Sequence, residues 1–259
     1  MPFHQPLPAL RLRRLLHRLT DAPLSQRDRL RSRHPLDSLP DGEYSAAVTV
    51  PYVPQFATPA LIARYIHDGL HGRDDPNWTE FGAPDAETYT FWAQRACAIA
   101  CVKMAVDTYH SALPRTLYDL VQECRDLGGY RLQDEHGRAV DQGWFYAPLV
   151  TLAEHNGLEV RGGSYASLLS ICTLLLDGWL VAAAVTPEIG ETGRLRRYDG
   201  HFVLVYGFRW ERRRLAAFVL HNPSGRTAPL QAAAVIPAGR FGRAFAHRFV
   251  AFRASQSRP

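Results

Sequence analysis

The sequence predicts an α+β fold in which N-terminal helices pack on a mostly antiparallel C-terminal sheet. Up to about residue 178, apolar residues recur at helical spacing, most clearly over residues 93–109, 116–129, 147–157 and 167–178. Beyond residue 178 the apolar segments are short, rich in β-branched and aromatic residues, and separated by turn residues: WLVAAAV, HFVLVYGF, RLAAFVLH and RFVAF. This order, helices first and strands second, favours α+β over a parallel α/β arrangement.

Composition indicates an ordinary globular protein. The chain has 259 residues, of which 46% are hydrophobic and 21% charged, so it can bury a substantial core. No apolar run approaches the roughly 18–20 residues that span a bilayer, so we expect no membrane span. The N-terminus interleaves arginine with leucine, unlike a secretory signal, and four cysteines are too few for a disulfide scaffold. We therefore expect a cytoplasmic protein with reduced thiols.

The N-terminal part differs in charge from the rest. Residues 1–45 are predicted to form a basic arm and linker, and residues 46–259 a single domain. Leucines at helical spacing predict an amphipathic helix over residues 8–20: Leu10, Leu12, Leu15, Leu16 and Leu19. Proline, glycine and aspartate mark residues 32–44 as a linker. The arm either contacts an acidic partner or a membrane surface, or is a solvated helix. No nucleic-acid motif accompanies it, so we expect no nucleic-acid partner.

Three segments that precede Cys97 carry structural signals. Residues 46–56, AAVTVPYVPQF, are predicted to be extended but not a central strand, because Pro51 and Pro54 cannot donate to a ladder. Residues 58–72 are predicted to be helical, with Thr58 as N-cap. The run TYTFW before Cys97 is β-branched and aromatic, which disfavours a helix interior. The next helix is therefore expected to begin near residues 93–96.

Cys97 and Cys101 lie four residues apart on that predicted helix, and three interpretations are open. Both can be small core residues, the pair can be half of a metal site, or one can be a nucleophile. A thiol attacks as thiolate, which is favoured at a helix N-terminus or beside an imidazolium. Cys97 is expected in the first helical turn and Cys101 one turn further into the core.

A base for the thiol is found downstream. His201 opens the apolar strand HFVLVYGF after a polar loop, and Asn222 follows the next strand. If these strands form a hairpin, Asn222 can approach His201 and accept a hydrogen bond from one ring nitrogen. The other interpretations are a histidine at a strand edge and an asparagine in a turn before proline.

These segments resemble a known family. ACAIACVKM resembles the nucleophile helix of the C39 and C39-like papain-fold cysteine peptidases, GHFVLVYGF their histidine strand, and LHNPSGR their Asp-Pro-x-Gly segment with asparagine in place of aspartate. The resemblance covers roughly residues 46–252. It implies a papain-like fold, with Cys97 as nucleophile, His201 as general base and acid, and Asn222 as the residue that orients the histidine.

Two positions depart from the family pattern. Ala98 stands where a glycine usually follows the nucleophile, and Phe91 stands where the glutamine of the oxyanion hole is usual. Two other glutamines can supply that donor. Gln55 resembles the glutamine of the family's extended N-terminal segment, whereas Gln94 is nearer but is expected on the helix and pointing away. We prefer Gln55.

The predicted function is therefore a cysteine peptidase-like enzyme. It cleaves a peptide, amide or thioester bond through a Cys-His-Asn triad and an acyl-enzyme, so its partner is a peptide or acyl-donor substrate. One alternative is an acyltransferase or cyclase that uses the same triad in peptide or natural-product maturation. Another is a non-catalytic module that binds a peptide in the same cleft.

Metal chemistry is weakly indicated. His67 and His71 are spaced four apart, as zinc ligands on a helix can be, but no glutamate occupies the HExxH position and no third ligand follows. No phosphate-binding glycine loop occurs. We expect no metal and no cofactor. Cys124 and Cys172 are expected to be core thiols.

Overall fold

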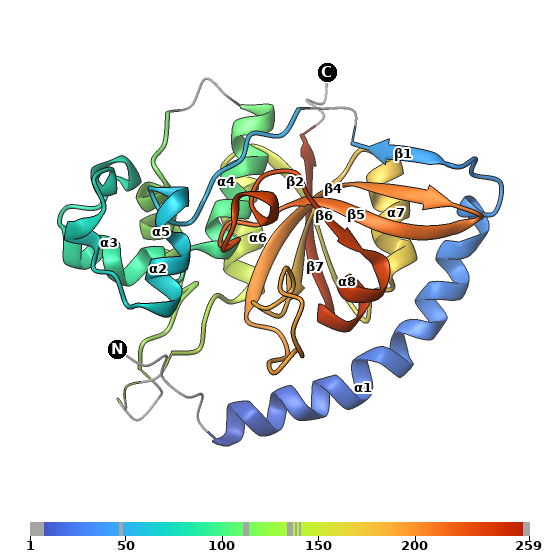
Figure 1. The fold of residues 1–259 in the computed structure, drawn as a ribbon, viewed down its shortest axis with the longest axis horizontal. Coiled ribbons are helices and arrows are strands. Elements are labelled where there is room, and N and C mark those ends of the chain that lie inside the picture. Colours follow the sequence, from blue (N-terminus) through green and yellow to red (C-terminus); the bar gives the residue numbers. More distant parts are fainter. Residues whose placement is uncertain are drawn as a thin grey trace.

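A computed structural model describes residues 8–46, 49–110, 114–133, 137, 139 and 141–255. Figure 1 shows helices gathered at one end of the molecule and a sheet at the other, with a long N-terminal helix beside the sheet. The α-helices are α1 (Pro8–Arg33), α2 (Ile62–His67), α3 (Ala86–Ala93), α4 (Cys97–Tyr109), α5 (Leu117–Asp126), α6 (Tyr146–His155), α7 (Leu168–Leu176) and α8 (Ala238–Ala244). Short 3₁₀ helices cover His34–Leu36, Pro59–Leu61, Gly72–Asp74, Trp78–Phe81 and Ala228–Leu230.

The strands form one sheet. They are β1 (Gly42–Ser45), β2 (Leu158–Ser164), β3 (Leu180–Val185), β4 (His201–Glu211), β5 (Arg214–His221), β6 (Ala234–Pro237) and β7 (Phe245–Ala254). Their order is β2-β7-β3-β4-β5-β6, with β1 paired to β4. All of these pairs are antiparallel. The α+β prediction, with helices packed on a mostly antiparallel sheet, is confirmed.

Both faces of the central strands are buried. In β3, Leu180, Ala182 and Ala184 belong to the core beneath α4, α5 and α6, whereas Val181, Ala183 and Val185 belong to the core beneath α7 and α8. This two-sided burial explains why WLVAAAV is continuously apolar rather than alternating. The sheet thus separates two cores, and α4 lies on the first.

Helices α5 and α7 begin where the sequence predicts. Thr116 and Ser167 each accept a hydrogen bond from the backbone N–H three residues on, and each forms a capping box. The apolar face predicted for residues 116–129 is the buried face of α5. The helix predicted over residues 58–72 is shorter: a 3₁₀ turn and α2 together end at His67, and Thr58 makes no side-chain capping bond.

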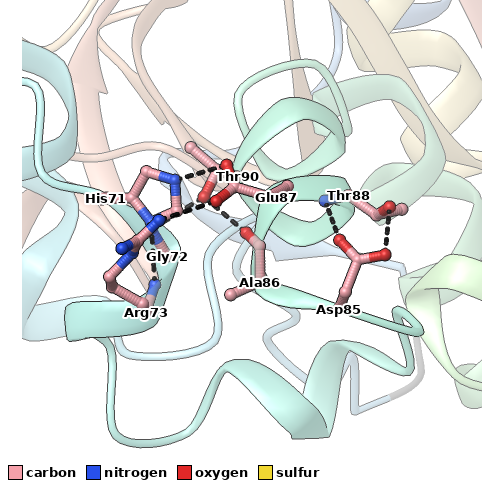
Figure 2. A network of polar contacts seen from close by, with 8 residues as sticks. All are labelled: His71, Gly72, Arg73, Asp85, Ala86, Glu87, Thr88 and Thr90. Carbon is pink, nitrogen blue, oxygen red and sulfur yellow. Dashed lines mark hydrogen bonds and ion pairs between the residues drawn. The ribbon is translucent and has the colours of Figure 1, made fainter.

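The prediction that TYTFW disfavours a helix is wrong. These residues belong to α3, whose N-cap Asp85 accepts a hydrogen bond from Thr88 N at 2.7 Å, as Figure 2 shows. Tyr89 and Trp92 are buried in the first core. A good cap and the burial of two aromatic rings thus outweigh the low helix propensity of the run.

The N-terminal helix is longer than predicted and presents a different face. Helix α1 continues to Arg33 and contacts α7 and β7. Leu16 and Leu19, expected on its buried side, are 54% and 64% exposed, whereas Asp21 is buried. The side chains of Leu10, Leu12 and Leu15 lie outside the described part.

Polar contacts made by Asp21 determine which face of α1 is buried. Asp21 accepts hydrogen bonds from Tyr198 Oη at 2.8 Å and from Arg248 Nη2 at 2.9 Å, so this carboxylate faces the sheet.

The prediction of a linker over residues 32–44 is also partly wrong, since Gly42–Ser45 pair with β4. The domain boundary at residue 45 stays a prediction. No helix in the described ranges is long and apolar enough to cross a membrane.

Candidate active site

The β4–β5 hairpin brings His201 and Asn222 together. The hairpin turns at Arg212 and Arg213, both at positive φ (51° and 58°), and its register pairs Leu204 with His221. Beyond that pair, His201 Nε2 lies 2.8 Å from Asn222 Oδ1. Both side chains are buried. The hairpin that the sequence predicts therefore sets the contact between them.

The orientation of the Asn222 amide is fixed by the backbone. Ser224 N donates to Asn222 Oδ1 at 3.1 Å, and a backbone N–H can only donate, so the atom between Ser224 and His201 is the oxygen. This oxygen can only accept, so His201 carries its proton on Nε2. The lone pair of the neutral ring is then on Nδ1.

Ser224 is a residue of this site that sequence reasoning missed. Its Oγ lies 3.3 Å from His201 Nε2, and its side chain is buried. A signal for it exists in the sequence. When the antiparallel register is continued from Leu204 and His221, Ser224 falls directly opposite His201.

Cys97 is the first residue of α4 and follows the turn that separates α3 from α4. It is half-buried, whereas Cys101, one turn further on, is fully buried in the first core. The backbone N–H of Phe202 acts on the Cys97 thiol, together with the N–H groups of Ala98 and of Cys97 itself. The start of β4, where His201 precedes Phe202, therefore lies beside the thiol.

The two reactive groups are both neutral at rest. Burial raises the pKa of the Cys97 thiol to about 11, although the three backbone N–H groups act in the opposite direction. The pKa of His201 is lowered to about 4, chiefly by burial; the Asn222 hydrogen bond raises it and the charge of Arg226 acts in the lowering direction. A thiolate at Cys97 is therefore disfavoured at rest.

The segment over residues 50–55 belongs to no helix or strand and is held along the end of β5. His221 Nε2 contacts Val50 O at 3.0 Å, Tyr52 Oη donates to Asn222 O at 3.1 Å, and Gln55 N donates to Pro223 O at 2.9 Å. These three contacts fix the path of a segment that has no strand of its own.

Gln55 lies between the helical and sheet halves of the site. Its side chain is buried, and Nε2 donates to Ala93 O, the last residue of α3, at 2.8 Å. If the amide were flipped, Gln55 Oε1 would face Ala93 O, and two acceptors cannot bond to each other. The amide nitrogen therefore faces this carbonyl. One N–H of the amide is then left to donate elsewhere. Its Oε1 is buried and has no hydrogen-bond partner in the described part of the chain.

The other sequence candidates lie elsewhere. Gln94 is the C-cap of α3, and no hydrogen bond joins its side chain to the residues above within the described ranges. His71 contacts Glu87 at 2.7 Å through Nε2 and accepts from Arg73 through Nδ1, in the network of Figure 2. No cluster of three potential metal ligands occurs among the residues that the structure describes.

A carboxylate lies next to the site. Asp199 precedes Gly200 and His201, has a positive φ of 63°, and accepts a hydrogen bond from Gly200 N at 2.7 Å. Its negative charge also acts on Cys97, where it opposes the thiolate. Arg248 Nη1 holds Asp199 at 2.9 Å and is shared with Asp21 of α1. The loop before His201 is thereby tied to β7 and to the N-terminal helix.

Comparison with known proteins gives a fold. No family model matches the sequence, and no curated protein matches it. Among solved structures, a protein from Bacillus anthracis that is described as a C39-like peptidase superposes with a TM-score of 0.51, over 83% of this chain and 100% of that chain, at 11% identity. This chain has the fold of C39-like peptidases.

Two transporter peptidase domains also align, with lower scores. The double-glycine-motif protease of an AMS/PCAT transporter, solved with a leader peptide, aligns at 18% identity and a TM-score of 0.39, over 61% of this chain and 84% of that chain. The peptidase domain of Streptococcus ComA aligns at 15% identity and a TM-score of 0.40, over 63% of this chain and 93% of that chain. The papain-like fold expected from the sequence resemblance is thus confirmed by the C39-like structure.

Proposed function

We propose that this protein is a cysteine peptidase that cleaves a peptide or amide bond through Cys97, His201 and Asn222. The observation that carries the proposal is the contact at 2.8 Å between His201 Nε2 and an Asn222 oxygen whose identity Ser224 N fixes. That contact leaves Nδ1 as the basic nitrogen of His201, the residue before Phe202, whose backbone N–H acts on the Cys97 thiol. The C39-like fold supports the same assignment.

The reaction begins with proton transfer from Cys97 Sγ to His201 Nδ1. The sulfur attacks the carbonyl carbon, and the carbonyl oxygen becomes an oxyanion. Collapse of this intermediate expels the amine, which takes the proton from His201, and leaves an acyl-enzyme on Cys97. Water, deprotonated by His201, then attacks the thioester and releases the acid. Asn222 keeps the ring in the tautomer that both steps need.

The oxyanion is assigned two donors. One is the backbone N–H of Cys97, at the N-terminus of α4, and the other is the free N–H of Gln55 Nε2. Gln55 is suited to this role because its position is set from both halves: Ala93 O holds the side chain and Pro223 O holds the backbone. Its partnerless Oε1 fits a side chain selected for its donor.

The proposal is tested by trapping the acyl-enzyme. The protein is incubated with a mixture of peptides and peptide thioesters, quenched in acid, and digested. The peptide that contains Cys97 and Cys101 is then fragmented in the mass spectrometer to locate the adduct. An acyl adduct on Cys97, absent from the Cys97→Ala variant and from the other three cysteines, is the expected result. Cys101→Ala is the matched control and should keep the adduct.

The same experiment separates the alternatives. An adduct that decays in water gives a peptidase, whereas an adduct that persists until an amine is added gives the acyltransferase or cyclase. Peptide that stays bound but never forms an adduct would contradict the proposal and identify a binding module. Ala98 and Phe91, which depart from the family pattern, are the residues that favour a binding module.

A further inference from the structure

A basic cavity lies outside the site described above. It has a volume of about 570 Å³ and is formed by the loop between β3 and β4, helix α8 and the start of β7. Four arginines line it, namely Arg194, Arg197, Arg240 and Arg243, together with His247. None of its lining residues, all of which the structure describes, is acidic.

One of these arginines builds the cavity. Arg240 donates to the carbonyl oxygens of Ile189 at 3.1 Å, Gly193 at 2.7 Å and Glu188 at 2.5 Å. The guanidinium thus holds the β3–β4 loop against α8 through three carbonyl oxygens. Burial lowers the pKa of Arg240 and the positive charge of Arg243 acts in the same direction, whereas the charges of Glu191 and Glu188 raise it.

Glu188 and Glu191, two acidic residues of the same loop, already bond to other groups. Glu188 Oε2 accepts from Arg196 N at 2.8 Å and from Arg197 N at 3.2 Å. Glu191 pairs with Arg226 at 2.8 Å. Arg194 and Arg243 are exposed and have no acidic partner among the described residues. Two guanidinium forks are therefore available to an anion, and carboxylates fit such forks well.

The cavity is close to the reacting groups. Tyr198 lines it, and three Cα steps of at most about 3.8 Å each lead from Tyr198 to His201. A substrate in extended conformation spans that distance with roughly three to four residues. Asp199 lies between them, so an acidic residue beside the cleaved bond is repelled, whereas one further along reaches the arginines.

We infer that this cavity is a specificity subsite that binds an acidic side chain of the peptide substrate, roughly three to five residues from the bond attacked by Cys97. The inference rests on the proposed function, because it takes the peptide to run from Cys97 past Asp199. Tyr198 gives the cavity an aromatic side, against which the methylene groups of a glutamate can pack while its carboxylate meets the guanidinium groups.

The test measures binding without chemistry. In the Cys97→Ala background, fluorescence anisotropy compares a fluorescein-labelled twelve-residue peptide that contains glutamates with the same peptide in which glutamine replaces them. The expected result is at least about tenfold tighter binding of the glutamate peptide, the effect of one or two charge-assisted hydrogen bonds. Arg194→Glu with Arg243→Glu should abolish the preference, and the neutral pair Arg194→Gln with Arg243→Gln should reduce it.

The matched control is the pair Arg212→Glu and Arg214→Glu. It changes net charge equally but lies at the turn beyond the far end of β4, eleven and thirteen residues from His201. It should keep the preference within about twofold. Equal loss in both pairs, no preference for glutamate, or tight binding of pyrophosphate without a glutamate preference would overturn the inference. Alkylation of Cys97 by iodoacetamide, measured in the native background, should be unchanged by the arginine substitutions. If the proposed function fails instead, Cys97 of the native protein reacts no faster than free cysteine, whatever the binding assay shows.

Discussion

The two halves of the candidate site are positioned by different kinds of structure. His201, Asn222 and Ser224 belong to one hairpin, where register alone sets which side chains meet. Cys97 and Gln55 come from a helix start and from a segment that belongs to no helix or strand, and long-range contacts position them. The sheet half is therefore fixed by local pairing, whereas the helical half depends on packing between distant parts of the chain.

The largest effect is expected from the two cysteines of α4. Cys97→Ala should lower peptide cleavage by at least about 10³-fold, because no other thiol lies at the helix start. Cys101→Ala should keep catalysis and lower the free energy of unfolding instead, since Cys101 is fully buried. Product formation from a peptide mixture and urea unfolding separate the two. Similar loss of cleavage in both folded variants would contradict the comparison.

Gln55 should have the next largest effect. Gln55→Ala removes a proposed oxyanion donor and should lower kcat by about 10²–10³-fold with little change in KM. Gln94→Ala, on the neighbouring turn, is the matched control and should change kcat less than about threefold. Steady-state kinetics on a cleaved peptide measure both. If Gln94→Ala has the larger effect, the donor has been assigned to the wrong glutamine.

Acid should destabilise the sheet half of the site. Because the pKa of buried His201 is lowered from 6.5 to about 4, the unfolded chain binds a proton more readily over this range. The stabilisation is present above pH 6.5 and is lost as pH falls towards 4. It amounts to about 3 kcal/mol at most. Burial also lowers the pKa of His221, which acts in the same direction.

Urea unfolding between pH 7 and pH 4 measures this effect, and His201→Gln is the control. The variant should lose less stability than the native protein over the same range. Equal acid sensitivity of the two proteins would show that His201 does not titrate with the lowered pKa.

Ser224 should have the smallest effect on catalysis. Ser224→Ala keeps the backbone N–H that fixes the Asn222 amide and removes only the hydroxyl 3.3 Å from His201 Nε2. We expect a loss of about three- to tenfold in kcat, with a shifted acid limb of the pH profile and unchanged KM. Thr is the conservative replacement and should restore part of the rate. A loss as large as that of Asn222→Ala would show that the hydroxyl, and not the amide, orients the ring.

The sheet half of the site could be predicted from the sequence better than the helical half. The hairpin was predictable because two apolar strands flank a short charged turn, and the same register would have revealed Ser224. The helicity of residues 86–93 was not predictable, because the cap at Asp85 and the burial of Tyr89 and Trp92 outweigh the low helix propensity of these residues. The buried face of α1 was not predictable either, since Asp21 meets Arg248 across more than two hundred residues.

Gln55 illustrates the limit. The resemblance of its segment to C39-like domains suggested it, but neither spacing nor periodicity does. Its position depends on Pro223 O and Ala93 O, which the chain brings together only in the folded state. Its catalytic role, like those of Cys97, His201 and Asn222, stays a prediction.

The measurement that tests the central claim most directly is the rate of Cys97 alkylation by iodoacetamide from pH 5 to 10, in the native protein and in His201→Ala. Cys97 and Cys101 share one tryptic peptide, so fragmentation of that peptide locates the label, while separate peptides report on Cys124 and Cys172. If His201 takes the thiol proton, the native protein should react at least about tenfold faster than the variant near pH 7. The difference should narrow as pH approaches the thiol pKa of about 11. Equal rates at every pH would contradict the proposal that His201 is the base for Cys97.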